Sequence, residues 1–193
     1  MKSRTALPIL LVLFATAAFA QHDPPMADAP KTDAQKSFDK LKTLAGAWEG
    51  QVTTTPPHPE MDGSLGKVTF RVTSMGNALM HDMKSTVRPD NPITMFYLDN
   101  NRLLLTHYCD AGNRPRMVAR TSSDGKTVEF DFLDVAGGTD YGHMHHAVFT
   151  ILDENHHIED WTYMEPGDKP IHAHIDLQRT KDPQRTSAQL QTN

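Results

Sequence analysis

Hydrophobic and polar side chains alternate along most of this chain, in short runs separated by turn-forming residues. Glycine, asparagine and aspartate cluster at residues 76–77, 99–101, 111–113, 123–125, 153–155 and 166–168, as they do in tight turns. The runs between these turns are rich in Val, Phe, Thr, Tyr and Leu, which favour extended backbone. The pattern predicts about ten strands, over residues 47–54, 66–75, 78–87, 93–99, 102–109, 115–122, 126–135, 142–152, 156–164 and 170–180.

One segment, residues 32–45, has helical periodicity instead. Phe38, Leu41 and Leu44 fall on one face of a helix there, and Thr32 is suited to cap its first turn. Gly46 follows, as is common where a helix ends. Strands joined by local hairpins, without crossover helices, form an antiparallel meander, and a long meander closes to remove its edges. We therefore predict an all-β protein: a closed, up-and-down antiparallel barrel of about ten strands with one N-terminal helix, over residues 32–180.

The two ends of the chain do not belong to this barrel pattern. Residues 1–20 combine Lys2 and Arg4 with an apolar run that ends in Ala18-Phe19-Ala20, the pattern of a signal peptide. An uncleaved membrane anchor is the alternative, but a helix of the apolar run, roughly 21 Å long, is shorter than the bilayer core of about 30 Å. We expect cleavage after Ala20 and a periplasmic or secreted protein. Residues 21–31 read as a flexible linker and 181–193 as a disordered tail.

Composition narrows the possible partners. The formal charge is −5, with 19 Lys and Arg against 24 Asp and Glu, and no basic block offers phosphate contacts, so we expect no nucleic-acid partner. No further segment is apolar enough to predict a membrane span after signal removal. The single cysteine, Cys109, excludes an internal disulfide, and in an oxidising compartment we expect it to be buried. The oligomeric state is left open.

A short string at the start of the predicted barrel resembles a known family. Residues 44–50 read LAGAWEG, which is similar to the helix-to-strand opening of lipocalin-like (calycin) barrels, and most of all to nitrobindin-type haem barrels and their uncharacterised secreted bacterial relatives. A second string, over residues 106–117, resembles the same relatives, and the resemblance runs from about Phe38 to Arg179. It implies that Trp48 closes one end of the barrel and that Arg179 lies over its ring as a cation–π contact.

Strand alternation also places polar residues on the inner face. His81 shares its face with Leu79 and Met83, and His107 shares its face with Leu105 and Cys109, because side chains two apart on a strand point the same way. We predict a ligand pocket lined by His81, Met83, Leu105, His107, Cys109 and Met117. The alternative is that the histidines are hydrogen-bonded within a filled core. The Pro- and Gly-rich residues 56–66 are a candidate lid over one mouth.

Other histidines raise the question of a metal or haem. His143 and His145 lie two apart and could start a transition-metal site. Nitrobindin-type barrels take a haem ligand from near the last strand, where this chain has His172 and His174. Alternation turns these two outward, so we favour a chain without that haem ligand. The pairs at residues 156–157 and 159–160 are expected to be polar surface.

Catalytic signatures do not appear in the sequence. There is no Gly-x-Ser-x-Gly, His-Glu-x-x-His or P-loop motif, so an enzymatic role has no support from motifs. Two hypotheses remain. The first is an exported binding protein for a small apolar or amphipathic ligand, which requires no cofactor. The alternative is a haem- or transition-metal-binding barrel with histidine ligands, with or without catalytic activity.

Overall fold

A computed structural model describes residues 30–87, 91–121 and 125–180 of the chain. The predicted signal peptide, most of the linker and the predicted tail lie outside the described residues. The described elements are the helix α1 (Asp33–Lys42) and the strands β1 (Gly46–Thr55), β2 (Leu65–Thr73), β3 (Ala78–Ser85), β4 (Ile93–Asp99), β5 (Arg102–Tyr108), β6 (Arg114–Thr121), β7 (Thr127–Ala136), β8 (His143–Ile151), β9 (His156–Glu165) and β10 (Lys169–Arg179). A short 3-10 turn, η1 (Ser74–Gly76), joins β2 to β3. Within the described residues no helix is long and apolar enough to span a membrane.

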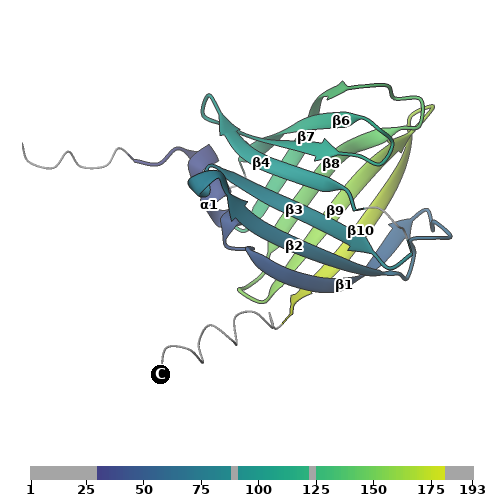
Figure 1. Ribbon diagram of the computed structural model, residues 1–193, viewed down its shortest axis with the longest axis horizontal. Helices are drawn as coiled ribbons and strands as arrows, with labels where there is room; N and C mark the ends of the chain where they lie inside the picture. The colour runs from purple at the N-terminus through teal and green to yellow at the C-terminus, as the bar shows by residue number, and fades with distance from the viewer. Residues whose placement is uncertain (1–29, 88–90, 122–124, 181–193) are drawn as a thin grey trace, which may run out of the picture. The chain divides into compact units, whose positions relative to one another are not determined.

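The strands form a closed barrel in which each strand pairs with its neighbours in the sequence (Figure 1). All pairs are antiparallel, and β1 closes the ring against β10, with Trp48 opposite Arg179 and Val52 opposite Ile175. Closure leaves no strand edge in the ring without a partner. The predicted fold class, a ten-stranded antiparallel barrel with one helix, is confirmed.

The helix α1 covers one end of the barrel. The Thr32 hydroxyl accepts a hydrogen bond from the Gln35 N–H and caps the first turn, as expected from its residue type. Phe38, Leu41 and Leu44 are buried in the core. The helix ends at Lys42 rather than at residue 45, because the next residues bond three positions back and tighten the chain before β1.

Trp48 and Arg179 join the helix, β1 and β10 at this closed end. The guanidinium carbon of Arg179 lies 4.0 Å from the centroid of the Trp48 ring. The same guanidinium donates to the backbone carbonyls of Ala45 at 2.8 Å and Thr43 at 3.1 Å. The Trp48 indole N–H donates to the Leu44 carbonyl at 2.8 Å. One cation and one indole therefore satisfy carbonyl groups that the end of the helix leaves without intrahelical partners.

Two glycines of the 44–50 string are required by close approach. Gly46 has φ +133°, and a Cβ there would lie 2.6 Å from Nη1 of Arg179. A Cβ on Gly50 would lie 2.0 Å from the backbone oxygen of Asp176, across the seam between β1 and β10. Only glycine fits at either position without a shift of the neighbouring atoms.

The connection between β1 and β2 lies at the opposite end. Asp62 accepts the Thr54 N–H at 2.7 Å, and the Thr54 hydroxyl accepts the His58 N–H at 2.7 Å. Gly63 donates to the Val52 carbonyl at 2.8 Å. This connection, the predicted lid, is therefore folded against the end of β1.

Candidate functional site: a cavity at the open end of the barrel

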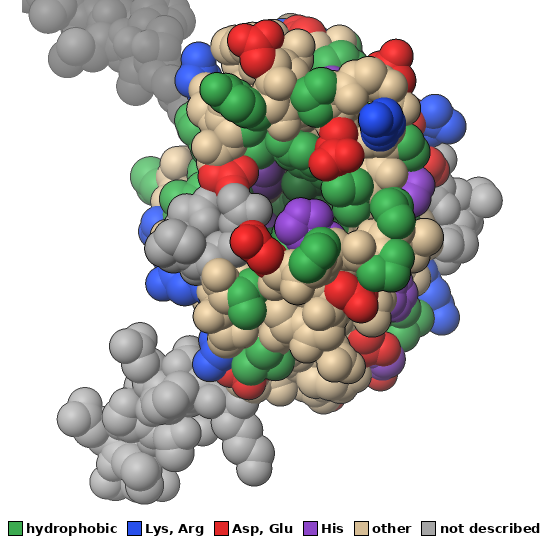
Figure 2. Space-filling model, turned by 90° about the vertical axis from the view of Figure 1, so that its right-hand side faces the viewer, with side chains coloured by type: hydrophobic (Ala, Val, Ile, Leu, Met, Phe, Trp, Pro, Cys, Tyr) green, Lys and Arg blue, Asp and Glu red, His purple; other side chains and the backbone are tan. Residues whose placement is uncertain are grey.

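The open end of the barrel leads into a cavity of about 440 Å³. Figure 2 looks onto this end and shows a hollow with hydrophobic and histidine side chains inside it and acidic side chains around it. Its apolar wall includes Val52, Met83, Met144, Trp161, Ile171, Ala173 and Ile175. His58 and Met61, from the connection between β1 and β2, contribute to the lining as well.

Four of the six predicted pocket residues line this cavity: His81, Met83, His107 and Cys109. Cys109 is half-buried at the wall rather than fully buried as expected, because the cavity reaches it. Leu105 and Met117 do not line the cavity, and this part of the prediction is corrected. They pair with each other across β5 and β6 and are fully buried in the core cluster, where aromatic side chains fill the interior.

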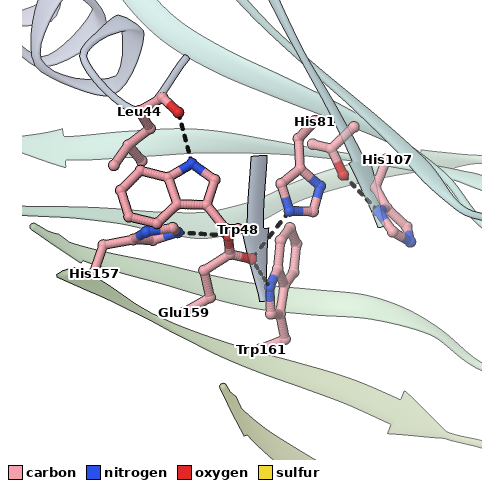
Figure 3. A network of polar contacts seen from close by, with 8 residues as sticks. Leu44, Trp48, His81, His107, His157, Glu159 and Trp161 are labelled. Carbon is pink, nitrogen blue, oxygen red and sulfur yellow. Dashed lines mark hydrogen bonds and ion pairs between the residues drawn. The ribbon is translucent and has the colours of Figure 1, made fainter. Parts of the chain in front are cut away.

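The cavity ends on a buried polar network that Figure 3 shows from close by. The Glu159 carboxylate lies at its centre and has no solvent exposure. Its Oε2 lies 3.1 Å from Nε2 of His81 and accepts the Trp161 indole N–H at 2.9 Å. Its Oε1 lies 3.0 Å from Nε2 of His157. Side chains from β3 and β9 thus surround one carboxylate with three nitrogen atoms.

The partners of Glu159 determine its charge. Burial by itself raises the pKa of this carboxyl, but the positive charge of His81 and the hydrogen bonds from His157 and His81 outweigh burial, so that the pKa is lowered from its ordinary value. Glu159 is therefore ionised at neutral pH and acts only as an acceptor. Both histidines must then carry a hydrogen on Nε2. A fully buried carboxylate is costly unless polar partners surround it, and here two imidazoles and the Trp161 indole do so.

His107 belongs to the same wall but has a different charge. Burial, and secondarily the positive charge of His81, lowers its pKa to about 4, so it is neutral at pH 7. Its Nδ1 lies 2.8 Å from the hydroxyl oxygen of the buried Thr94. Within the described residues this is the only hydrogen bond of that hydroxyl. We assign Thr94 as the donor, because its hydrogen would otherwise be buried without an acceptor, and this tautomer leaves N–H on Nε2 of His107.

The sequence prediction for β9 was wrong at two positions. His157 and Glu159 were expected at the surface, but both are fully buried. They share their face with Trp161, also buried, whereas Ile158 lies on the opposite face. The presence of Trp161 two residues further on was the available signal, because the largest apolar side chain of a strand usually sets the phase of its inner face.

The structure places the predicted metal residues His143 and His145 away from the cavity lining. Nε2 of His143 lies 3.2 Å from Nδ1 of His145, and the His145 ring stacks on Phe132 with centroids 4.8 Å apart. The register between β8 and β9 shifts between Met144 and His146, so His145 is the extra residue of a bulge and the two imidazoles are not held on one regular face. The two imidazole rings thus contact each other and the Phe132 ring.

Among the described residues, a different group on β7 and β8 has the spacing to hold a metal ion. Ligand atoms of Glu129, Asp131 and His146 lie within 4.8 Å of one another. Arg120 forms an ion pair with Asp131, and a cation would compete with this guanidinium. The group is half-exposed on the wall formed by β7 and β8, away from the cavity.

The residues do not fit a haem held from the last strand. His172 and His174 are exposed on β10, where His174 pairs with Asp160 at 2.6 Å and His172 lies 3.1 Å from the Thr162 hydroxyl. Their inward neighbours on that strand are Ile171, Ala173 and Ile175, which line the cavity. In the cavity, His107 presents N–H rather than a lone pair, so it does not offer an iron ligand in this tautomer.

Comparisons with known proteins support the fold and give no activity. No family model and no curated protein matches the chain. Among solved structures it is similar to Rv2717c from M. tuberculosis, with 15% identity and a TM-score of 0.55 over 75% of this chain and 98% of that one. It is also similar to a protein of unknown function from the DUF3598 family of Nostoc punctiforme, with 10% identity and a TM-score of 0.52. The latter match covers 72% of this chain and 48% of that one.

The topology and these two solved structures define the class of fold: a closed antiparallel β-barrel. At these identities the two solved structures share the fold, and their names assign no ligand.

Proposed function

We propose that this chain is an exported, lipocalin-like binding protein for a small apolar or amphipathic molecule. The observation that carries the proposal is the cavity of about 440 Å³ at the open end of the barrel, with a largely apolar wall and imidazoles at its inner end. Volumes of this size are typical of small-molecule sites, in which apolar walls supply affinity and a few polar groups fix orientation. Export is proposed from the signal-peptide pattern of residues 1–20.

The wall and the rim have different compositions. Ala173 of β10 lies beside Trp161 of the neighbouring strand β9, and both line the cavity. Met83 and Met144 add unbranched side chains that adapt to irregular ligands. Lys84, Asp110 and Glu165 are the charged residues of the lining. An apolar ligand would therefore lose its contact with water along the barrel axis while its outer end stays near charged groups.

A pair of variants on β10 tests the proposal. Ala173→Trp fills the cavity from its wall, whereas His172→Trp adds the same indole at the adjacent, outward position. We expect the chain from residue 21 onward to bind the neutral fluorescent probe N-phenyl-1-naphthylamine, His172→Trp to bind it equally well, and Ala173→Trp to lose binding by about tenfold or more. Equal probe binding by both folded variants, or no binding by the parent chain, would refute a ligand cavity.

A further inference from the structure

The His107 ring turns one unpaired polar atom toward the cavity. His107 is 4% exposed and lines the cavity. Its Nδ1 lies 2.8 Å from the Thr94 hydroxyl, whereas its Nε2 has no hydrogen-bond partner among the described residues. Figure 3 shows this second nitrogen on the edge of the ring that points away from Glu159 and the closed end. A ligand in the cavity would therefore meet this edge of the ring.

The neighbouring histidine is closed to a ligand. Nε2 of His81 faces Glu159 at 3.1 Å. Nδ1 of His81 is sealed inside the packing, where it has neither contact with solvent nor a hydrogen-bond partner among the described residues. Nε2 of His107 is not sealed in this way. The polar contact at the inner end is thus a single nitrogen, and a ligand needs no second histidine to use it.

Thr94 determines what this nitrogen offers. The Thr94 hydroxyl is buried and donates to Nδ1 of His107, because its hydrogen would otherwise lack an acceptor. Burial lowers the pKa of His107 to about 4, so the ring is neutral at pH 7. A neutral imidazole has one donor and one acceptor, and its Nε2 therefore carries the hydrogen. The cavity offers a neutral N–H, which an oxygen lone pair can accept.

The surrounding charges favour an uncharged ligand. Glu159 is ionised and buried beside His81 at the same inner end, and Asp110 and Glu165 belong to the lining. These carboxylates would repel a ligand anion, and a hydrogen bond from the neutral His107 does not compensate for the lost hydration of a charge. An ammonium group is also disfavoured, because it has only donors to set against the His107 N–H.

We propose that the ligand is an uncharged apolar carbonyl compound, such as a ketone, aldehyde or ester, whose oxygen accepts a hydrogen bond from Nε2 of His107. A carbonyl suits this place better than a hydroxyl, because it has no hydrogen of its own that would need an acceptor. The Trp161 ring, 5.7 Å from the His107 ring between centroids, would pack against the apolar part. This assignment rests on the proposed binding function and adds the class of ligand and the atom that holds it.

Three competitors that share a nonyl chain test the class of ligand at pH 7. They are methyl nonyl ketone, the alkene in which a methylene group replaces its oxygen, and decanoate, and each competes with N-phenyl-1-naphthylamine for the cavity. We expect the ketone to displace the probe and decanoate to bind at least about tenfold more weakly than the ketone. Decanoate binding as tightly as the ketone would overturn the assignment and leave the binding function standing. No binding of the probe or of any competitor would overturn both.

Two variants locate the hydrogen bond. Thr94→Val combined with His107→Phe removes both partners of a buried hydrogen bond, which preserves folding better than removing one. Tyr141→Phe removes only a hydroxyl, at a lining residue that is 78% exposed. We expect the double variant to weaken ketone binding about fivefold more than alkene binding, and Tyr141→Phe to bind both as the parent does. Equal losses for ketone and alkene in the double variant, or a selective loss for the ketone in Tyr141→Phe, would overturn the proposal.

The carbonyl stretching band of the bound ketone gives a measurement that needs no variant. A hydrogen bond to the oxygen lowers the frequency of this band. The infrared band of methyl nonyl ketone bound to the parent chain should therefore lie below its position in hexane. A band at the hexane position would show a carbonyl without a donor and would overturn the proposal, even if the double variant does not fold.

Discussion

Glu159 is the residue on which the interior of this barrel depends most. It brings a full negative charge into a site without solvent exposure, and three nitrogen atoms within 3.1 Å compensate for the loss of water. Removal of one partner would leave the carboxylate underpaired, which costs more than the bond itself is worth. His107, on the same cavity wall, avoids the cost of a buried charge because it remains neutral at pH 7.

The neutral state of His107 has a consequence for stability. Its pKa is about 4 in the folded chain against 6.5 as the ordinary value, so between these two pH values the unfolded chain binds a proton that the folded chain does not. The free energy of unfolding therefore falls as pH falls through this window, by about 2–3 kcal/mol from this one group between pH 7 and 4.5.

Comparison with a variant isolates this effect from the other titrating groups. Urea denaturation of the parent chain and of Thr94→Val/His107→Phe at pH 7 and pH 4.5 gives two differences in unfolding free energy. The variant should lose about 2–3 kcal/mol less than the parent over this interval. Parallel losses in both proteins would show that His107 is protonated in the folded chain at pH 4.5.

At the scale of elements, the junction of α1 and β1 organises the closed end. The helix delivers Phe38, Leu41 and Leu44 to the core, and β1 follows after only a few residues with Trp48. Arg179, the last residue of β10, lies over the indole and donates hydrogen bonds to the backbone carbonyls that follow the helix. Two side chains, Trp48 and Arg179, thereby fix α1 and β1 to β10, which is distant from them in sequence.

Truncation of the tryptophan at this junction should be among the most damaging single changes. Trp48→Ala should lower the free energy of unfolding by about 3–5 kcal/mol, because a large buried ring is lost and a cavity remains. Tyr108→Ala, at an aromatic residue that is 50% exposed on β5, serves as the control and should change it by less than about 0.5 kcal/mol. Denaturant midpoints measure both. Similar midpoints for Trp48→Ala and the parent would contradict the role of Trp48 in closing the barrel.

At the scale of the whole molecule, closure of the ring between β1 and β10 joins the first strand to the last. The seam is tightest at Gly50, where the β10 backbone occupies the space of a Cβ. The barrel and its cavity therefore depend on a contact between residues more than a hundred positions apart.

A single added methyl group tests the seam. Gly50→Ala should destabilise the barrel by about 1–3 kcal/mol or more, because a backbone atom, and not a flexible side chain, must move. Gly138→Ala is the matched control, since an added Cβ there would lie 3.8 Å from a side-chain oxygen of Asp140, and its stability should stay within about 0.5 kcal/mol of the parent. Guanidinium chloride unfolding compares them. A Gly50→Ala protein as stable as Gly138→Ala would show that the two strands separate freely at this point.

The fold was predictable because local signals were consistent along the chain. Turn residues at short intervals, one helical segment and period-two alternation all favoured the same meander, and β2 to β10 lie close to the predicted ranges. The same alternation placed His81 and His107 on the inner face. It also turned His172 and His174 outward, because β10 has an unbroken apolar face that leaves no ambiguity of phase.

The sequence by itself thus determined the strand order, the closed end and the inward phase of most strands, since these follow from short-range patterns. Tertiary structure alone decided the rest. Which inward residues line the cavity and which fill the core depends on depth along the barrel axis, so Leu105 and Met117 are buried below the cavity. The bulge at His145 and the burial of His157 and Glu159 also depend on partners from other strands. A carboxylate becomes an interior residue only where His81 and Trp161 converge on it, and that convergence is a property of the closed ring.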